Sequence, residues 1–280
     1  MPIKLIASDL DGTLLDSNKQ ITEYTRTIIR NSVRQGVIFA FCTGRISNEL
    51  VEIVAELPEI RYAITCNGAY VIDLLTEKVI HNNLIPMNNV RNIYKSLAGF
   101  DMMFELYADG QVYTDEKCLA DLNRYGLLYR KELIYNTRIG IKDFSDYIRK
   151  REEPVGKVNI SFNNQLVRDQ AKEIVSRYPY DITCQKPINL EINREGVNKG
   201  YGLRKLAEFL NIERNEIMAI GDNNNDLSML HFAGVSVAMD NAIDEVKRAA
   251  DYVTMSNDEN GVAFAIENYN NQKLFICIKE

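Results

Sequence analysis

Short apolar runs alternate with longer amphipathic stretches in the first third of the chain. Residues 3–8 and 37–43 are apolar almost throughout, which predicts strands that are buried on both faces. Residues 22–35 and 47–57 carry apolar side chains at helical spacing, and Thr22 suits the N-cap of the first helix. The order strand, helix, strand, helix predicts a parallel sheet.

The middle of the chain has a different pattern. Apolar and polar side chains alternate on both sides of Asp109 and Gly110 and again along residues 157–164, which predicts antiparallel strands with one covered face. Helical patterns are found between these strands, at residues 86–97, 116–125 and 166–178. We therefore expect an α+β unit here, inserted into the surrounding α/β unit.

The first pattern returns toward the C-terminus. Further core elements are expected as a strand at 62–66, a hairpin at 70–82, helices at 198–210, 225–232 and 242–250, and strands at 216–222 and 234–239. The simplest organisation is an α/β core with a parallel sheet, formed by residues 1–83 and 189–280. An α+β domain at residues 84–188 divides this core.

The charge balance and the cysteines limit the possible functions. The chain has 33 Lys and Arg against 39 Asp and Glu, a formal net charge of −6 and no basic run, which disfavours nucleic-acid binding and favours a small-molecule partner. The five cysteines are scattered without a C-x-x-C pair, so we expect them to be reduced. No apolar run approaches the roughly 20 residues of a membrane span, and we expect a cytoplasmic protein without a membrane contact.

Four polar clusters follow predicted core strands or begin a core helix. Asp9 and Asp11 follow the first strand, residues 43–45 follow the second, residues 221–226 follow a later one, and Lys199 begins a helix. In open parallel sheets, ligands bind outside the carboxyl ends of the strands. We therefore expect the four clusters to form one site.

Four carboxylates in these clusters indicate a metal ion; they belong to Asp9, Asp11, Asp222 and Asp226. Brought together they would repel one another unless a cation lay among them, and hard carboxylate oxygens suit Mg²⁺. An aspartate beside a metal can attack phosphorus, and a second carboxylate can transfer the proton. We assign the attack to Asp9 and the proton transfer to Asp11, with Gly12 permitting the unusual backbone of the turn.

A phosphate fits the remaining polar groups. Thr43 and the backbone amides around Gly44 offer hydrogen bonds, and Lys199 offers a positive charge. Alone, each of these groups has an ordinary structural explanation such as a helix cap or a turn. The ordered set predicts a site that binds a phosphate ester beside Mg²⁺.

Four ordered motifs resemble those of the haloacid dehalogenase superfamily of phosphatases. They are DLDGT at 9–13, TGR at 43–45, GVNKG at 196–200 and GDNNND at 221–226. The NGA at 67–69, the LEIN at 190–193 and the place of the insertion are similar to the Cof-type branch. The resemblance spans nearly the whole chain and implies a Rossmann-like core with an inserted α+β cap that closes over the substrate.

The resemblance also implies roles for the matched acidic residues. Asp9 would be the nucleophile and a Mg²⁺ ligand. Asp11 would be the general acid and base, and would bind Mg²⁺ through its backbone carbonyl. Asp222 would complete the metal site, and Asp226 would support the metal ligands.

A phosphate-binding set is implied in the same way. Thr43 and Gly44 would hold the phosphoryl group, Lys199 would neutralise it and orient Asp9, and Asn225 would touch the phosphate. The implied activity is Mg²⁺-dependent hydrolysis of small phosphorylated metabolites, sugar phosphates above all, through an aspartyl-phosphate on Asp9.

Other functions are compatible with the same motifs. Phosphorylated cofactors such as flavin mononucleotide or pyridoxal phosphate are alternative substrates. A phosphosugar mutase would use the same intermediate and pass the phosphoryl group to a second hydroxyl, whereas a non-catalytic sensor would bind a phosphometabolite without turnover. The insertion carries no motif that matches a substrate, and the sequence leaves the oligomeric state open.

Overall fold

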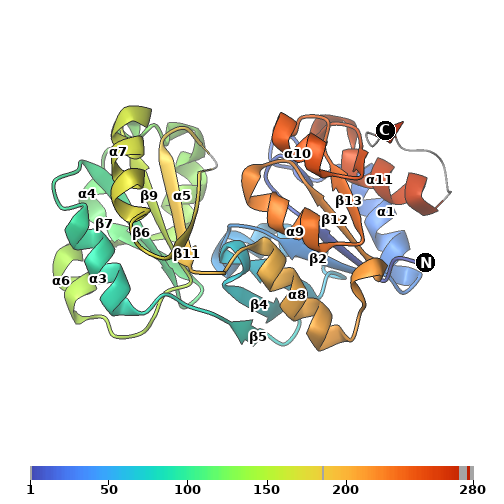
Figure 1. Cartoon of the computed structure of the whole chain (residues 1–280), viewed down its shortest axis with the longest axis horizontal. Helices are drawn as coiled ribbons and strands as arrows, with labels where there is room; N and C mark the ends of the chain where they lie inside the picture. The colour runs from blue at the N-terminus through green and yellow to red at the C-terminus, as the bar shows by residue number, and fades with distance from the viewer. Residues whose placement is uncertain (1, 185, 271–275, 278–280) are drawn as a thin grey trace. The chain divides into compact units, whose positions relative to one another are not determined.

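Two separate sheets organise the part of the chain that the computed structural model describes, residues 2–184, 186–270 and 276–277. Each sheet belongs to its own unit (Figure 1). The core unit consists of Met1–Gly44, Val51–His81 and Asn198–Glu280, and the inserted unit of Arg45–Leu50 and Asn82–Val197. The limits 84–188 expected for the inserted domain remain a prediction.

The core sheet has nine strands in the described chain, in the order β15-β14-β13-β12-β1-β2-β3-β4-β5. Their bounds are β1 Leu5–Ser8, β2 Ile38–Cys42, β3 Tyr62–Thr65, β4 Tyr70–Asp73, β5 Lys78–Asn82, β12 Ile217–Gly221, β13 Val235–Ala238, β14 Tyr252–Val253 and β15 Ile276–Cys277. β1 pairs in parallel with β2 and β12, so that Ser8 lies opposite Phe41 and Ile220. The expected parallel sheet is confirmed, and antiparallel β4 and β15 extend it.

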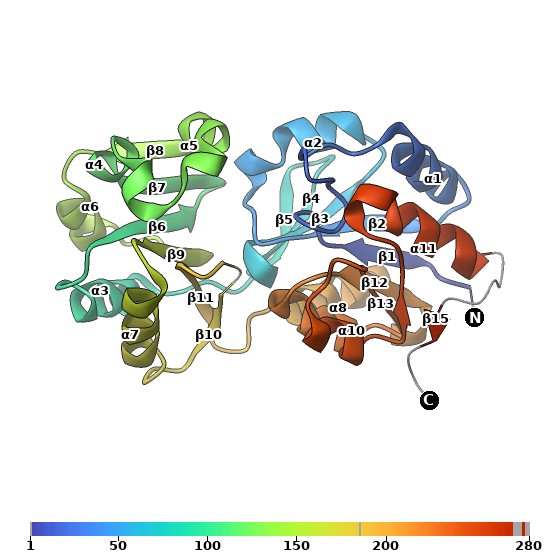
Figure 2. The same cartoon turned by 90° about the horizontal axis from the view of Figure 1, so that it is seen from above.

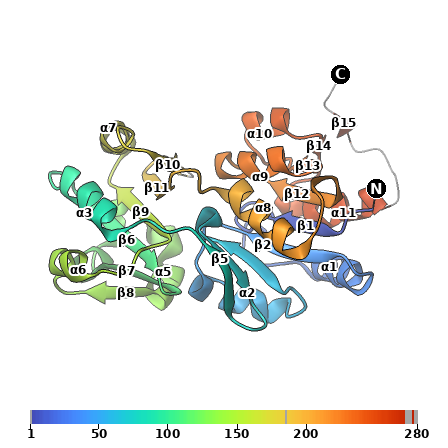
Figure 3. The same cartoon turned by 60° about the horizontal axis from the view of Figure 1, so that its bottom comes forward.

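Helices cover both faces of the core sheet. Figures 2 and 3 show α1 (Glu23–Arg34) and α2 (Val51–Glu56) on one face, with α8 (Lys199–Leu210) and α10 (Asp244–Ala249) on the other. The elements that complete these layers are α9 Leu227–Phe232, which packs on α8, and α11 Gly261–Asn270, which packs on α1. The N-cap of α1 expected at Thr22 is confirmed, because the Thr22 hydroxyl oxygen accepts a hydrogen bond from the backbone N–H of Thr25.

Two of the expected helices are interrupted. Residues 47–57 form the 3₁₀ turn η1 (Ser47–Glu49) and the separate helix α2, because the Glu49 carboxylate accepts from the backbone N–H of Ile46 and closes a first short turn. Residues 116–125 divide into α4 (Glu116–Leu119) and the 3₁₀ turn η3 (Leu122–Tyr125). The division lies at Asp121, whose non-helical backbone and side chain cap the second turn.

The sheet of the inserted unit has six strands in the described chain, in the order β10-β11-β9-β6-β7-β8. The bounds are β6 Met102–Ala108, β7 Gln111–Asp115, β8 Arg138–Ile141, β9 Lys157–Phe162, β10 Tyr180–Thr183 and β11 Asn189–Arg194. The hairpin expected at Asp109 and Gly110 is confirmed, and both residues have positive φ angles, 54° and 74°. All strand pairs of this six-stranded sheet are antiparallel, except that β7 pairs in parallel with β8.

One face of this sheet packs against three helices. Phe104, Val158 and Ile160 belong to an apolar cluster with side chains from α3 (Met87–Ser96), α6 (Phe144–Lys150) and α7 (Gln165–Val175). The sequence pattern predicted α3 and α7, but it missed α6, α5 (Lys131–Thr137) and β8. These short elements lack a long periodic pattern.

The opposite face carries polar side chains that are buried as well, although the sequence pattern predicted only one covered face. Lys157 is 1% exposed and its ammonium lies 2.9 Å from the Glu191 carboxylate. Arg138 contacts Glu49 at 2.5 Å, Glu105 at 2.9 Å and the Tyr107 hydroxyl at 3.0 Å. We call Arg138 and these last three residues the Arg138 network. Polar side chains can be buried here because they pair with one another.

Candidate active site

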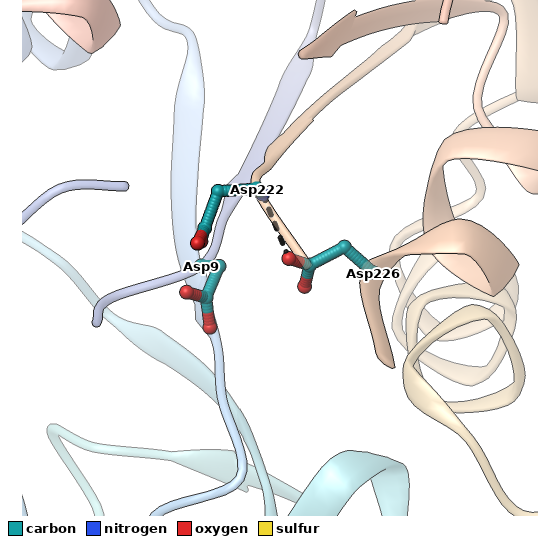
Figure 4. A group of neighbouring side chains, drawn as sticks. All are labelled: Asp9, Asp222 and Asp226. Carbon is teal, nitrogen blue, oxygen red and sulfur yellow. Dashed lines mark hydrogen bonds between the residues drawn. The ribbon is translucent and has the colours of Figure 1, made fainter. Parts of the chain in front are cut away.

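The ends of two neighbouring core strands and one tight turn bring three carboxylates together. Asp9 follows β1, Asp222 follows β12, and Asp226 ends the 3₁₀ turn η6 (Asn224–Asp226). One oxygen of each carboxylate lies within 4.8 Å of the others, and all three side chains are buried. Figure 4 shows the three side chains as neighbours. We call Asp9, Asp222 and Asp226 the carboxylate triad. The expectation that strand ends would bring together residues far apart in sequence is met for these three.

Lys199 is the cation of this group. Its ammonium lies 2.5 Å from Asp9 Oδ1 and 2.6 Å from Asp226 Oδ1, and the residue is fully buried. The helix begins at Lys199 because the Asn198 side chain accepts a hydrogen bond from the backbone N–H of Tyr201. The capped start of α8 therefore directs the ammonium into the triad.

The hydrogen bonds distinguish the roles of the three carboxylates. Asp226 Oδ2 accepts the backbone N–H groups of Asp222 and Asn223, both at 2.9 Å, while its Oδ1 faces Lys199. Asp222 Oδ1 accepts the Thr13 hydroxyl at 2.8 Å. Among the described residues, Oδ2 of Asp9 and Oδ2 of Asp222 have no donor. These two oxygens are thus the best placed to bind a cation.

Two glycines allow the loops to approach one another. Gly12 has a φ of +91°, and a Cβ at this position would lie 2.6 Å from Asp222 Oδ2. A Cβ on Gly221 would lie 2.5 Å from the Cβ of Asp226. Both the backbone angle and the space at Gly12 exclude other residues, which explains the DG pair that follows the first strand.

The charges of the site do not balance. Burial raises the pKa of Asp9 well above its usual range; Lys199 opposes this shift, and Asp226 and Asp222 add to it. Burial, followed by the charge of Asp226, raises the pKa of Asp222 to about 6. Burial alone would lower the pKa of Lys199, but Asp226 and Asp9 raise it above its usual value. Three carboxylates with one ammonium leave a surplus of negative charge that a divalent cation would offset.

Asp11 is not one of the three carboxylates of the triad. Its carboxylate accepts a hydrogen bond from the Lys19 ammonium at 3.0 Å, and its side chain is 35% exposed. A partly exposed carboxylate can exchange a proton with solvent, which the buried triad cannot do as readily. The charge of Asp11 also contributes to the raised pKa of Asp222, after burial and the charge of Asp226.

The residues expected to bind phosphate lie at the end of β2 and in η6. The backbone carbonyl of Thr43 accepts from the N–H of Asn67 at 3.0 Å, and the Asn225 amide donates to Asn67 Oδ1 at 3.3 Å. Gly44 is the last residue of the first segment of the core unit, Met1–Gly44. Asn67 belongs to the NGA motif, and no role in the site was predicted for it.

Cys42 lies beside Lys199. Its thiol lies 3.9 Å from the Lys199 carbonyl oxygen, and burial raises its pKa, so the thiol stays protonated and is no candidate nucleophile. The free cysteines include Cys42, Cys66, Cys118 and Cys184, and the side chain of Cys277 lies outside the described part of the chain.

Comparison with curated proteins finds relatives along nearly the whole chain. The putative phosphatase YxeH of Bacillus subtilis is 32% identical over 266 residues, which cover 94% of this chain and 97% of the relative. The 5-amino-6-(5-phospho-D-ribitylamino)uracil phosphatase YcsE of Bacillus subtilis is 30% identical, with coverage of 95% of this chain and 96% of the relative.

Within the described residues, no helix combines the length and apolar character needed to cross a membrane.

Solved structures agree with this relationship. A haloacid dehalogenase-like hydrolase from Bacteroides thetaiotaomicron has a TM-score of 0.82 and 30% identity, and the match covers 95% of this chain and 99% of that one. A second such hydrolase, from B. subtilis, has a TM-score of 0.83 and 28% identity, with the same coverage. The expected fold, a Rossmann-like core with an inserted α+β unit, is therefore confirmed. Residues 6–266 match the family model of haloacid dehalogenase-like hydrolases, and the chain belongs to this family.

Proposed function

We propose that this hydrolase is a Mg²⁺-dependent phosphatase that acts on small phosphorylated metabolites through an aspartyl-phosphate on Asp9. The observation that carries the proposal is the buried carboxylate triad, in which Asp9 and Asp226 share the ammonium of Lys199. A buried group with this surplus of negative charge favours a bound cation. Its place beyond the strand ends is the usual ligand position in such a sheet.

Lys199 would orient the nucleophile. It holds Asp9 through Oδ1 and so orients the carboxylate that attacks the phosphorus of the substrate. A bond forms between a carboxylate oxygen of Asp9 and phosphorus while the bond from phosphorus to the alcohol oxygen breaks. The positive charge of Lys199 would also stabilise the negative charge on the phosphoryl oxygens.

Asp11 would transfer the proton in both halves of the reaction. In the first half it protonates the departing alcohol oxygen, and in the second it removes a proton from the water that attacks phosphorus. The second step releases inorganic phosphate and restores the Asp9 carboxylate. The partial exposure of Asp11 supports this role, because the carboxyl group must be accessible to the departing oxygen and to the attacking water.

The donor set fits Mg²⁺. Asp9 and Asp222 each offer an oxygen without a donor, and the family resemblance adds the backbone carbonyl of Asp11. Bound there, the ion would supply positive charge that offsets the carboxylates and the phosphoryl oxygens. Asp226 would brace the loop through its contacts with Lys199 and the backbone of Asp222, which is the supporting role that the resemblance implies.

The phosphate would be held by groups at the end of β2 and in η6. Thr43 and Gly44 follow β2, and Asn225 lies in η6. The Thr43 side chain, the Gly44 backbone amide and the Asn225 side chain can each donate a hydrogen bond. Sugar phosphates are the expected substrates. The name of one relative specifies a substrate with a phosphorylated ribityl chain, which supports a polyhydroxy leaving group.

The proposal is tested by phosphate release from a panel of sugar phosphates, nucleotides and phosphorylated cofactors, with Mg²⁺ and with a chelator. We expect release that requires the metal and a phosphorylated protein that is trapped on acid quench of the wild type but not of Asp9→Asn. An isomeric phosphosugar instead of free phosphate would identify a mutase. Binding of the panel compounds without either product would identify a sensor and contradict the proposal.

A further inference from the structure

We infer that Asn67 is a positioning residue of the phosphate site and that its side chain acts through Asn225. This inference rests on the proposed function. Asn67 is 2% exposed, and its Oδ1 accepts the Asn225 amide at 3.3 Å. Its backbone N–H donates to the carbonyl of Thr43 at 3.0 Å. One residue thus joins two others that are expected to bind the same phosphate.

The contact with Asn225 determines where that amide points. A side-chain amide nitrogen carries two hydrogens in one plane. When one of them is donated to Asn67 Oδ1, the plane is fixed and the second hydrogen has a defined direction. Asn225 directly precedes Asp226 in the sequence. The Asp226 carboxylate contacts the Lys199 ammonium at 2.6 Å, so the residue with the oriented amide is adjacent in the chain to a charged residue of the site. Such preorganisation lowers the cost of binding an anion.

The backbone around Asn67 makes this placement rigid. Cys66, Asn67 and Gly68 have φ angles of 51°, 55° and 98°, so that three successive residues are left-handed. A Cβ on Gly68 would lie 2.1 Å from the carbonyl oxygen of Asn198, the N-cap of α8. The turn therefore rests directly on the start of the helix that carries Lys199 at its first position.

A simpler explanation is that asparagine stands here only because it tolerates the left-handed backbone. The variant Asn67→Gly separates the two explanations. Glycine adopts this backbone without strain and keeps the N–H that bonds to Thr43, so only the side-chain amide is removed. Asn211→Gly is the matched control, because Asn211 is also left-handed, with a φ of 53°, and is exposed at the end of α8.

The experiment measures the dissociation constant of inorganic phosphate in the presence of Mg²⁺, KM and kcat with a substrate from the panel, and the melting temperature. We expect Asn67→Gly to weaken phosphate binding and raise KM by about 10-fold, the loss of one hydrogen bond to an anion. We expect kcat to change by less than about 3-fold, and Asn211→Gly should bind phosphate like the wild type. The melting temperature shows that each variant is folded under the conditions of the assay.

A double-mutant cycle supplies the second readout. If Asn67 acts through Asn225, the variant that combines Asn67→Gly with Asn225→Ala should bind phosphate as weakly as Asn225→Ala alone. Fully additive losses, or an Asn67→Gly variant that binds phosphate like the control, would overturn the inference while leaving the phosphatase intact. A wild type that neither binds nor releases phosphate would overturn the proposed function as well, so the two failures can be told apart.

Discussion

The carboxylate triad of the core unit and the Arg138 network of the inserted unit both bury charge, with opposite consequences. In the triad, three carboxylates share one ammonium, and burial with mutual repulsion raises the pKa of Asp9 and Asp222. In the network, two carboxylates share a guanidinium with five N–H donors. Burial alone would raise the pKa of Glu49, but Arg138 lowers it below its ordinary value.

The difference is the one expected between a proposed metal site and a structural cluster. The carboxylates of the Arg138 network have a donor within the chain, so they need no ligand to be stable when buried. The triad lacks enough positive charge and leaves two oxygens without donors. Burial by itself therefore does not mark a functional site, whereas burial with uncompensated charge does.

Asp9→Asn should have the largest effect. The amide cannot attack phosphorus, so we expect turnover to fall by about 10³-fold or more. Folding should not suffer, because the amide oxygen can still accept from Lys199 and one charge is removed from the triad. Phosphate release and the melting temperature measure the two effects. Near-normal turnover would contradict the assignment of the nucleophile.

Arg138→Met should be the most destabilising change in the inserted unit. It leaves the carboxylates of Glu49 and Glu105 buried without their cation, which typically costs about 3–5 kcal/mol. Urea unfolding measures the loss. Arg124→Met is the matched control, because the side chain of Arg124 is 55% exposed in its ion pair with Asp101 and should contribute less than about 1 kcal/mol. Equal effects of both variants would remove the basis of the comparison.

Asp222→Asn should stabilise the metal-free protein at pH 7, on the order of 1–3 kcal/mol. The pKa of Asp222 is raised from 3.8 to about 6 in the folded state, so ionisation above pH 6 opposes folding. As the pH falls from 7 to about 4, the wild type should regain this stability and the gap to Asp222→Asn should close. Melting curves in chelator measure the gap, and a variant less stable than the wild type at pH 7 would refute the charge surplus.

Glu49→Gln should show the opposite pH dependence and the smallest effect of these changes. The pKa of Glu49 is lowered in the folded state from 4.5, so its ionised form stabilises the fold above that pH and the contribution is lost as the pH falls through the folded pKa. The wild type should therefore be more stable than Glu49→Gln at pH 7, and the gap should narrow below pH 4.5. A stability difference between the wild type and Glu49→Gln that widens as the pH falls would show that the ionised Glu49 carboxylate does not stabilise the Arg138 network.

Much of the fold could be predicted because its signals are local. The apolar runs that form β1, β2 and β12 mark buried parallel strands wherever their partners lie, and Thr22 and Asn198 cap their helices with their own side chains. The interrupted helices were predicted wrongly for a related reason. A helical period gives no sign that Glu49 or Asp121 will cap a new turn within it.

The site was predicted only in part. The motifs predicted which residues would carry the chemistry, since Asp9, Gly12 and Asp222 stand in recognisable local patterns, and the roles of these residues stay predictions. Sequence gave no sign that Asp11 would pair with Lys19, nor that Asn67 would join Thr43 to Asn225. The positive φ of Asn67 could have been suspected from the NG pair, but its partner lies 158 positions away.

The sequence by itself determined the order of strands and helices, the glycine that the first turn requires, and the residue types of the site, because each depends on neighbours in the chain. Only the tertiary structure decided which charges meet. Lys199 and Asp9 are 190 positions apart, and Arg138 and Glu49 are 89 positions apart. Whether a buried charge finds a partner depends on how distant segments pack, and this determines which cluster is left to bind a ligand.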